Sequence, residues 1–126
     1  MYKVVIVGAD ERAWNLSQKK EAKAWIEIIF SMFPYAQFIS GHCPKGGIDI
    51  WVECGCKQSK IRNFKPFKPK VKKWGGKGGY KDRNMKMAEY GDLIIDIEPK
   101  GHRSGGTWTK EYAENIGKRV WKIEIQ

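Results

Sequence analysis

The sequence predicts an α/β fold, specifically one Rossmann-like domain whose parallel five-stranded sheet lies between two layers of helices. The alternation of elements predicts this three-layer α/β/α arrangement, and the length of the chain predicts a single domain. Short β-branched runs alternate with segments of helical periodicity along the whole chain. Such alternation favours parallel strands joined by right-handed crossovers, with helices on both faces. At 126 residues the chain has the length of one domain, spanning 1–126. We expect the strand order 3-2-1-4-5.

The chain opens with a strand and a long helix. Residues 2–8, YKVVIVG, are a β-branched run that ends in glycine, as a buried strand does. A helix is expected over residues 15–33, because Asn15 and Gln18 resemble a capping box. Apolar residues then follow with helical spacing: Ala22, Trp25, Ile26, Ile29 and Phe33.

The middle of the chain is expected to add two strands and a helix before a long loop. Residues 36–40 are a second strand, and residues 48–59 can form a helix that Gly55 weakens. Residues 61–67 are expected to be a third strand, ended by prolines. Residues 68–79, KPKVKKWGGKGG, are expected to be an exposed loop.

The last third repeats the alternation twice. Helices are expected over residues 80–90 and 107–117, the second closed by Gly117. Strands are expected over 92–97 and 119–125.

Charge is concentrated in one segment. The net charge is +10, and residues 57–86 hold twelve Lys and Arg residues with a single acid, Asp82. No window approaches the roughly 18 apolar residues of a membrane span, and the amino-terminal run is too short for a signal peptide. The three cysteines lack disulfide-framework spacing. We therefore expect a cytoplasmic protein with reduced thiols and no membrane partner.

Glycine and polar residues follow the expected strands, where open parallel sheets bind ligands. Two Gly-Gly pairs, at 46–47 and 105–106, stand just before expected helices. Free amides at a helix start bind anions, and glycine lets a phosphate approach closely. The sequence lacks GxGxxG after the first strand and lacks a P-loop, which disfavours ordinary NAD and ATP-hydrolase functions. Two histidines alone do not complete a metal site, so no metal or cofactor is expected.

Three segments together resemble a known superfamily. These are ISGHCPKGGIDIWVE (39–53), KDRNMKMAEYGDLIIDI (81–97) and SGGTWTKEYAENIGKRV (104–120). They resemble the SLOG superfamily of Rossmann-like proteins, and within it the YspA-related group. That superfamily includes lysine decarboxylase-like enzymes that release cytokinin bases from nucleoside monophosphates, the DNA-uptake protein DprA, and predicted sensors of nucleotide-derived signals.

The resemblance implies a pocket for a nucleotide or a related phosphoribosyl compound at the carboxyl edge of the sheet. The phosphate is expected on Gly105, Gly106 and Thr107, with help from Gly46 and Gly47. Asp49 caps a helix or binds a ribose hydroxyl. The full set of expected ligand-binding residues is Gly8, Ala9, Gly41, Lys45, Gly46, Gly47, Asp49, Arg83, Asn84, Ser104, Gly105, Gly106 and Thr107.

Catalysis is left open by the sequence. Arg83 matches an arginine of the phosphoribohydrolase members, and Glu111, one helical turn past Thr107, is the acid nearest to their glutamates. The chain reads SGGTWTKE where those enzymes have PGGxGT and adjacent glutamates. Arg83 and Glu111 are therefore candidate catalytic residues of an N-glycosidic hydrolase, and a sensor without hydrolysis is equally compatible.

The basic segment supports an alternative function. Lys and Arg alternate there with aromatic residues, as in proteins that bind single-stranded nucleic acid. The residues that would do so are Lys65, Lys68, Lys70, Lys72, Lys73, Trp74 and Lys77. A solvated loop, or a cationic lid over an anionic ligand, explains the same residues. A homodimer is a further expected partner state.

Overall fold

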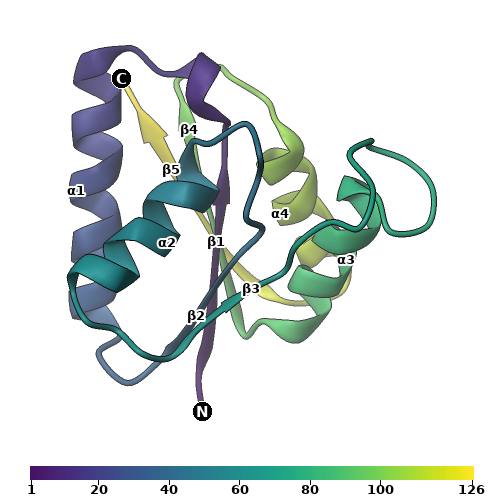
Figure 1. Ribbon diagram of the computed structural model, residues 1–126, viewed down its shortest axis with the longest axis horizontal. Helices are drawn as coiled ribbons and strands as arrows, with labels where there is room; N and C mark the ends of the chain where they lie inside the picture. Colours follow the sequence, from purple (N-terminus) through teal and green to yellow (C-terminus); the bar gives the residue numbers. More distant parts are fainter.

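The computed structural model describes residues 1–126 and confirms the fold class. Five parallel strands form one sheet in the order β3-β2-β1-β4-β5 (Figure 1). The strands are β1 (Lys3–Gly8), β2 (Gln37–Ser40), β3 (Phe64–Pro66), β4 (Leu93–Pro99) and β5 (Arg119–Ile125). The expected order is therefore correct.

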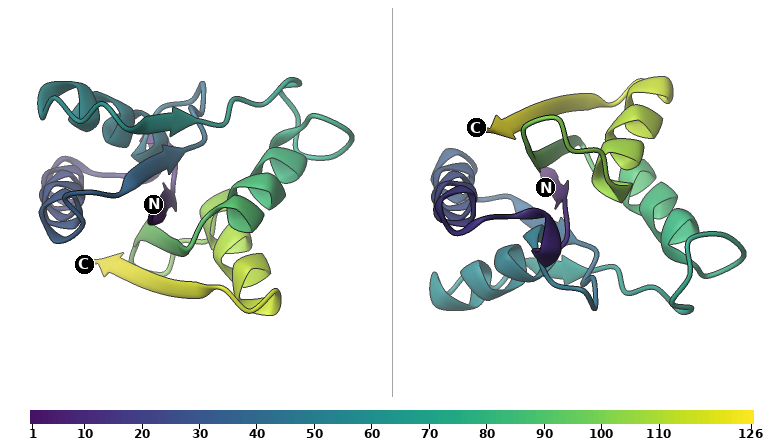
Figure 2. Two further views of the ribbon diagram at one scale, coloured as in Figure 1. Left: turned by 90° about the horizontal axis from the view of Figure 1, so that it is seen from below. Right: turned by 90° about the horizontal axis from the view of Figure 1, so that it is seen from above.

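Four α-helices cover the two faces of the sheet in pairs. They are α1 (Leu16–Met32), α2 (Ile48–Gln58), α3 (Tyr80–Tyr90) and α4 (Gly105–Asn115), with a short 3-10 turn, η1 (Glu11–Ala13), before α1. Figure 2 shows α1 and α2 on one face and α3 and α4 on the other. No helix is both long and apolar enough to cross a bilayer.

The central strand β1 divides the core between the two faces. Val4 and Ile6 face α1 and α2, whereas Val5 and Val7 face α3 and α4. This alternation is the two-residue period of a strand that is buried on both sides. Strand order reverses at β1, because β2 and β3 extend the sheet on one side and β4 and β5 on the other. The loops after β1 and β4 therefore diverge at the carboxyl edge.

Helix α1 begins at a capping box and buries the apolar side that its spacing predicts. Asn15 accepts from the Gln18 amide at 2.8 Å, and the Gln18 side chain accepts from the Asn15 amide at 3.0 Å, which confirms the capping box of α1. Ala22, Ile26 and Ile29 are buried as their spacing indicates. Trp25 is more than a third exposed, because it lies at the edge of that stripe.

Three elements differ by two residues or more from the bounds that the sequence predicts, and one of them, β4, ends at Pro99 rather than at residue 97. Strand β3 covers only Phe64–Pro66 instead of 61–67, because it is an edge strand that pairs with β2 alone. Helix α4 begins at Gly105, two residues before the expected start, because Ser104 caps it. Gly117 follows α4 with φ +82°, the left-handed conformation that ends many helices.

Candidate ligand-binding cavity

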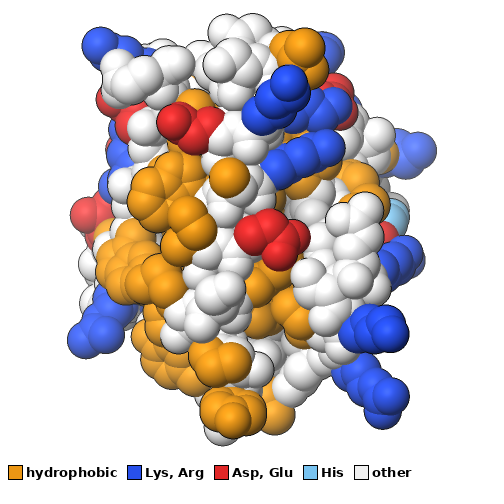
Figure 3. All heavy atoms as spheres, turned by 90° about the vertical axis from the view of Figure 1, so that its left-hand side faces the viewer, with side chains coloured by type: hydrophobic (Ala, Val, Ile, Leu, Met, Phe, Trp, Pro, Cys, Tyr) orange, Lys and Arg blue, Asp and Glu red, His pale blue; other side chains and the backbone are white.

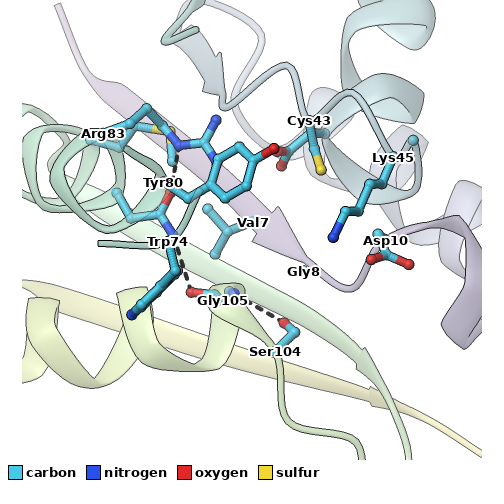
Figure 4. A pocket seen from close by; sticks show the side chains of 15 residues that line it. Val7, Gly8, Asp10, Cys43, Lys45, Trp74, Tyr80, Arg83, Ser104 and Gly105 are labelled. Atoms are coloured by element: carbon cyan, nitrogen blue, oxygen red, sulfur yellow. Dashed lines mark hydrogen bonds between the residues drawn. The ribbon is translucent and has the colours of Figure 1, made fainter. Parts of the chain in front are cut away.

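A cavity of about 160 Å³ lies at the carboxyl edge of the sheet, beside the point where strand order reverses. Its walls come from the loops after β1, β2 and β4, from the start of α3, and from the loop of residues 68–79 within the basic segment, which we call the basic loop (Figure 4). The lining residues are Val7, Gly8, Asp10, Cys43, Lys45, Gly46, Asp49, Trp74, Tyr80, Arg83, Asn84, Met87, Ser104, Gly105 and Gly106.

Most of the residues expected to bind a ligand meet at this cavity. Those that line it are Gly8, Lys45, Gly46, Asp49, Arg83, Asn84, Ser104, Gly105 and Gly106. Ala9, Gly41, Gly47 and Thr107 do not line it, because they are buried in the walls behind the lining. The expected position of Glu111 near the cavity is wrong: its side chain is 45% exposed and pairs with Arg103 at 2.7 Å.

The sequence did not single out several of the lining residues. Val7, Asp10, Cys43, Tyr80 and Met87 line the cavity as well. The signal that could have identified most of them is their position at the carboxyl end of β1, in the loops after β1 and β2, or at the start of α3, whereas Met87 lies further along α3. Burial raises the pKa of the Cys43 thiol, which therefore stays protonated near neutral pH.

Arg83 is buried, and two of its three side-chain nitrogens form hydrogen bonds that hold the fold together. Its Nε donates to the Asn84 side chain at 2.6 Å, and its Nη1 donates to the carbonyl groups of Gly41 and Phe67. These bonds tie α3 to the ends of β2 and β3. Its Nη2 makes no hydrogen bond within the protein, so one edge of the guanidinium remains available to an anion.

Asp49 lies behind Arg83 and holds the loop after β2. The main-chain amides of Gly41 and Cys43 lie near its carboxylate and favour the ionised form. Burial nevertheless raises its pKa to about 6, an effect that the charge of Arg83 opposes. No ion pair joins the two side chains within 4 Å. The carboxylate of Asp49 is therefore engaged in shaping the loop.

The second glycine of each Gly-Gly pair is needed for packing. A Cβ atom on Gly106 would lie 2.6 Å from the Gly8 nitrogen, and one on Gly47 would lie 2.5 Å from the Asp10 Cα. Because both contacts are with main-chain atoms, neither neighbour can move aside. These glycines let α2 and α4 begin directly against the end of β1.

The start of α4 satisfies most of its own amides. The Ser104 hydroxyl oxygen accepts from the Gly106 amide at 3.0 Å and from the Thr107 amide, and it donates to Glu98 at 2.6 Å. The expected phosphate contacts from Gly106 and Thr107 are therefore not available. The Gly105 amide makes no hydrogen bond within the protein, and Gly105 lines the cavity. Of the three residues at this helix start that are expected to contact a phosphate, only Gly105 thus has a free amide.

Two buried carboxyl groups lie beneath this helix start. Asp96 is fully buried on β4, and neither of its oxygens meets a donor group of another residue. Its polar neighbour is the carboxyl of Glu98, which is equally buried. Two carboxyl groups can bond to each other only if one is protonated. Burial, and then Glu98, raise the pKa of Asp96 to about 9, so the pair holds a proton at neutral pH.

The basic loop contributes one residue, Trp74, to the wall of the cavity. Trp74 of this loop packs edge-on against Trp108 of α4, with ring centroids 5.4 Å apart. The loop is held by main-chain bonds from Lys70 and Val71 to Gly78 and from Tyr80 to Lys73. It therefore forms an ordered rim whose tryptophan contacts the helix start, as a lid over this site would.

No group of three or more His, Cys, Asp and Glu residues is arranged to hold a metal ion. Comparison with protein-family models finds no match to this chain, and comparison with curated proteins finds none either.

Proposed function

We propose that this protein binds a nucleotide or a nucleotide-derived phosphoribosyl ligand in the cavity, as its resemblance to the SLOG superfamily implies. The observation that carries the proposal is the meeting of two cations with an unpaired amide. Arg83, Lys45 and Gly105 come from three separate segments and line the same cavity. A phosphate group has oxygens enough to accept from all three.

The anion site that we propose differs from the one expected from the sequence, in which main-chain amides beside the Gly-Gly pairs hold the phosphate. Its main donors are the free Nη2 of Arg83 and the Lys45 ammonium, with the Gly105 amide as a third. Asp10, one of two acids that line the cavity, is engaged with Arg12 at 3.0 Å, and this bond lowers the pKa of Asp10. The local balance of unpaired charge therefore favours an anion.

The size of the cavity limits how the ligand is held. Pockets that enclose a whole drug-sized ligand measure roughly 300–1,000 Å³, whereas this one measures about 160 Å³. The sugar and phosphate fit inside, and the base lies at the rim. Trp74 and Tyr80 offer aromatic surface there, on which a base stacks.

The proposed role is binding, because the cavity offers no free carboxylate suited to attack on a glycosidic bond. Glu111 pairs with Arg103 away from the cavity, Asp10 is paired with Arg12, and Asp49 is buried beside the loop after β2. A sensor or carrier of a nucleotide-derived signal agrees with this arrangement better than a phosphoribohydrolase does.

Calorimetric titration with nucleoside monophosphates, ADP-ribose and cyclic dinucleotides tests the proposal. Lys45→Ala should weaken binding of the best of these ligands at least about tenfold, because a hydrogen bond to a charged group contributes roughly 1.5–3 kcal/mol. Lys20→Ala, an exposed lysine on α1, is the matched control and should leave the affinity unchanged. Equal affinities in the two variants would reject the cavity as the site.

A second candidate function, binding of single-stranded nucleic acid, has one supporting observation. The candidate lysines on β3 and in the basic loop are exposed and none forms an ion pair: Lys65, Lys68, Lys70, Lys72, Lys73 and Lys77. Their aromatic neighbours are less suitable, because Phe67 packs on Tyr90 and Trp74 packs on Trp108. Such binding would be mainly electrostatic.

A further inference from the structure

We propose that the outer face of α1 is the interface of a homodimer, an inference that does not depend on the proposed ligand. Apolar side chains follow this face with helical spacing at Trp25, Ile28 and Met32, and Tyr35 continues the row in the turn after the helix. Tyr2 stacks on Phe33 beside them, with ring centroids 5.6 Å apart. Figure 3 shows apolar side chains gathered over this side of the molecule.

This group of side chains, which we call the α1 patch, consists of Tyr2, Trp25, Ile28, Met32 and Tyr35. All five are large and more than a third exposed, and Tyr35 is 91% exposed. The packing of the monomer explains none of this exposure, because α1 already buries Ala22, Ile26, Ile29 and Phe30 on its inner face. The helix is thus apolar on two sides, and only one side has a partner within the chain.

The area of the α1 patch matches what one dimer interface requires. With about 200 Å² for each large side chain, the five residues expose on the order of 500 Å² of apolar surface. A standard interface buries about 800 Å² per partner, and roughly 65% of it is apolar in homodimers. The apolar part of such an interface is therefore also about 500 Å².

The distribution of charge favours a second copy of this chain on this face. Twelve of the Lys and Arg residues lie in 57–86, and the loop of this segment projects on the side opposite to α1 (Figure 1). Residues 16–35 carry three lysines and two glutamates, and are close to neutral. Two copies that meet through α1 therefore keep their basic segments far apart, whereas any pairing near α3 brings them together.

The surroundings of α1 support this choice over the edge of the sheet. Strand β5 is an edge strand, but Arg119, Lys122 and Glu124 are exposed along it, and charges of this kind oppose pairing with another strand. On its other side, the α1 patch adjoins a groove of about 390 Å³ between α1 and α2, lined by Ala24 and Trp51 among others. This groove can receive a side chain from the partner. No residue of α1 lines the ligand cavity, which stays open in the dimer.

Analytical ultracentrifugation over a range from about 1 to 500 μM tests this inference. The wild-type protein should sediment as a dimer at the upper concentrations, and should still do so in 1 M NaCl, because salt does not weaken apolar contact. Ile28→Asp should be monomeric over the whole range. Ile116→Asp is the matched control, because Ile116 is 41% exposed, Ile28 is 46% exposed, and Ile116 lies at the end of α4. It should remain dimeric.

Three outcomes would overturn the proposal. A wild-type protein that is monomeric at 500 μM has no self-association through this face. A dimer that persists in Ile28→Asp uses another surface. Association that disappears in 1 M NaCl depends on charge, as assembly around contaminating nucleic acid does. Circular dichroism and thermal unfolding of the two variants identify any loss of dimer that comes from misfolding.

Discussion

Gly106 at the start of α4 packs against Gly8 at the end of β1 so closely that a Cβ atom on Gly106 would lie 2.6 Å from the Gly8 nitrogen and 2.7 Å from its Cα. This contact places the amino-terminal end of α4 directly against the end of the central strand. It also gives the two glycines of the pair different roles. Both line the cavity, but Gly106 is required by the fold and its amide is bonded to Ser104, whereas the amide of Gly105 is free.

Replacing each glycine in turn should separate these roles. Gly106→Ala should lower the free energy of unfolding by about 2–3 kcal/mol, because an added methyl group meets rigid main chain. Gly105→Ala should change it by less than about 1 kcal/mol, because the nearest atoms belong to the side chains of Trp74 and Asn84, at 3.3 and 3.4 Å. Urea unfolding measures both values. Equal losses would contradict the assignment.

Asp96 should make the protein less stable as the pH rises. An unfolded Asp loses its proton near pH 4, whereas the folded protein keeps it until about pH 9. Between these values the folded state binds more protons, so the free energy of unfolding falls with increasing pH, by at most about 1.4 kcal/mol per unit. Asp96→Asn should flatten this decline and raise stability at pH 8.

The range from pH 6.5 to 8.5 isolates this effect, because Asp49, whose pKa is about 6, has largely titrated below it. Asp82→Asn is a useful control, since the Gly78 amide lowers the pKa of Asp82 and moves its titration further from that range. A slope in Asp96→Asn as steep as in the wild type would show that Asp96 is ionised in the folded protein.

Trp74 should contribute to ligand affinity without contributing much to stability. It is 42% exposed on a loop, and its ring lies against the start of α4 at the cavity rim. Loss of stacking on a base costs about 1–3 kcal/mol, so Trp74→Ala should weaken binding of a nucleotide about fivefold or more. Val71→Ala, in the same loop, should bind like the wild type. Calorimetry with unchanged affinity for Trp74→Ala would exclude the stacking role.

The basic loop should bind nucleic acid only through charge. In filter binding with single-stranded oligonucleotides, affinity should fall steeply with salt, by a slope of about 0.7 per phosphate contact on logarithmic axes. Replacing Lys70, Lys72 and Lys73 together with Glu should abolish the binding that remains at low salt.

A control with the same change in net charge replaces Lys20, Lys100 and Lys122, which are exposed elsewhere. If both triple variants lose binding equally, net charge is responsible and the loop is not a specific surface. If the wild type binds tightly and independently of salt, the electrostatic account of the loop is wrong.

The fold could be predicted because its signals are local and repeat along the chain. β-Branched runs alternate with amphipathic segments, and short loops join them, so the layers and strand order follow from general rules. The sequence predicts a start of α4 at residue 107, two residues too late, because Gly105 and Gly106 have low helix propensity. Their packing against Gly8, across almost a hundred residues, overrides that preference.

The site could be predicted only in part, for a related reason. The carboxyl-edge rule brought Lys45, Arg83 and Gly105 to the same place. A sequence does not distinguish a glycine that approaches a ligand from one that approaches its own backbone, as Gly106 does. The contact of Trp74 with Trp108 and the proton held by Asp96 both depend on tertiary packing.

Chemical-shift mapping by NMR tests the central claim most directly. Adenosine 5′-monophosphate and adenosine are titrated separately into protein labelled with ¹⁵N, and the Gly105 amide and the Arg83 Nε–H are observed. We predict that the monophosphate shifts both signals, together with amides around Lys45, and that adenosine leaves the Gly105 and Arg83 signals in place. Shifts confined to the loop lysines, or shifts of equal size with both compounds, would contradict a phosphate site in this cavity.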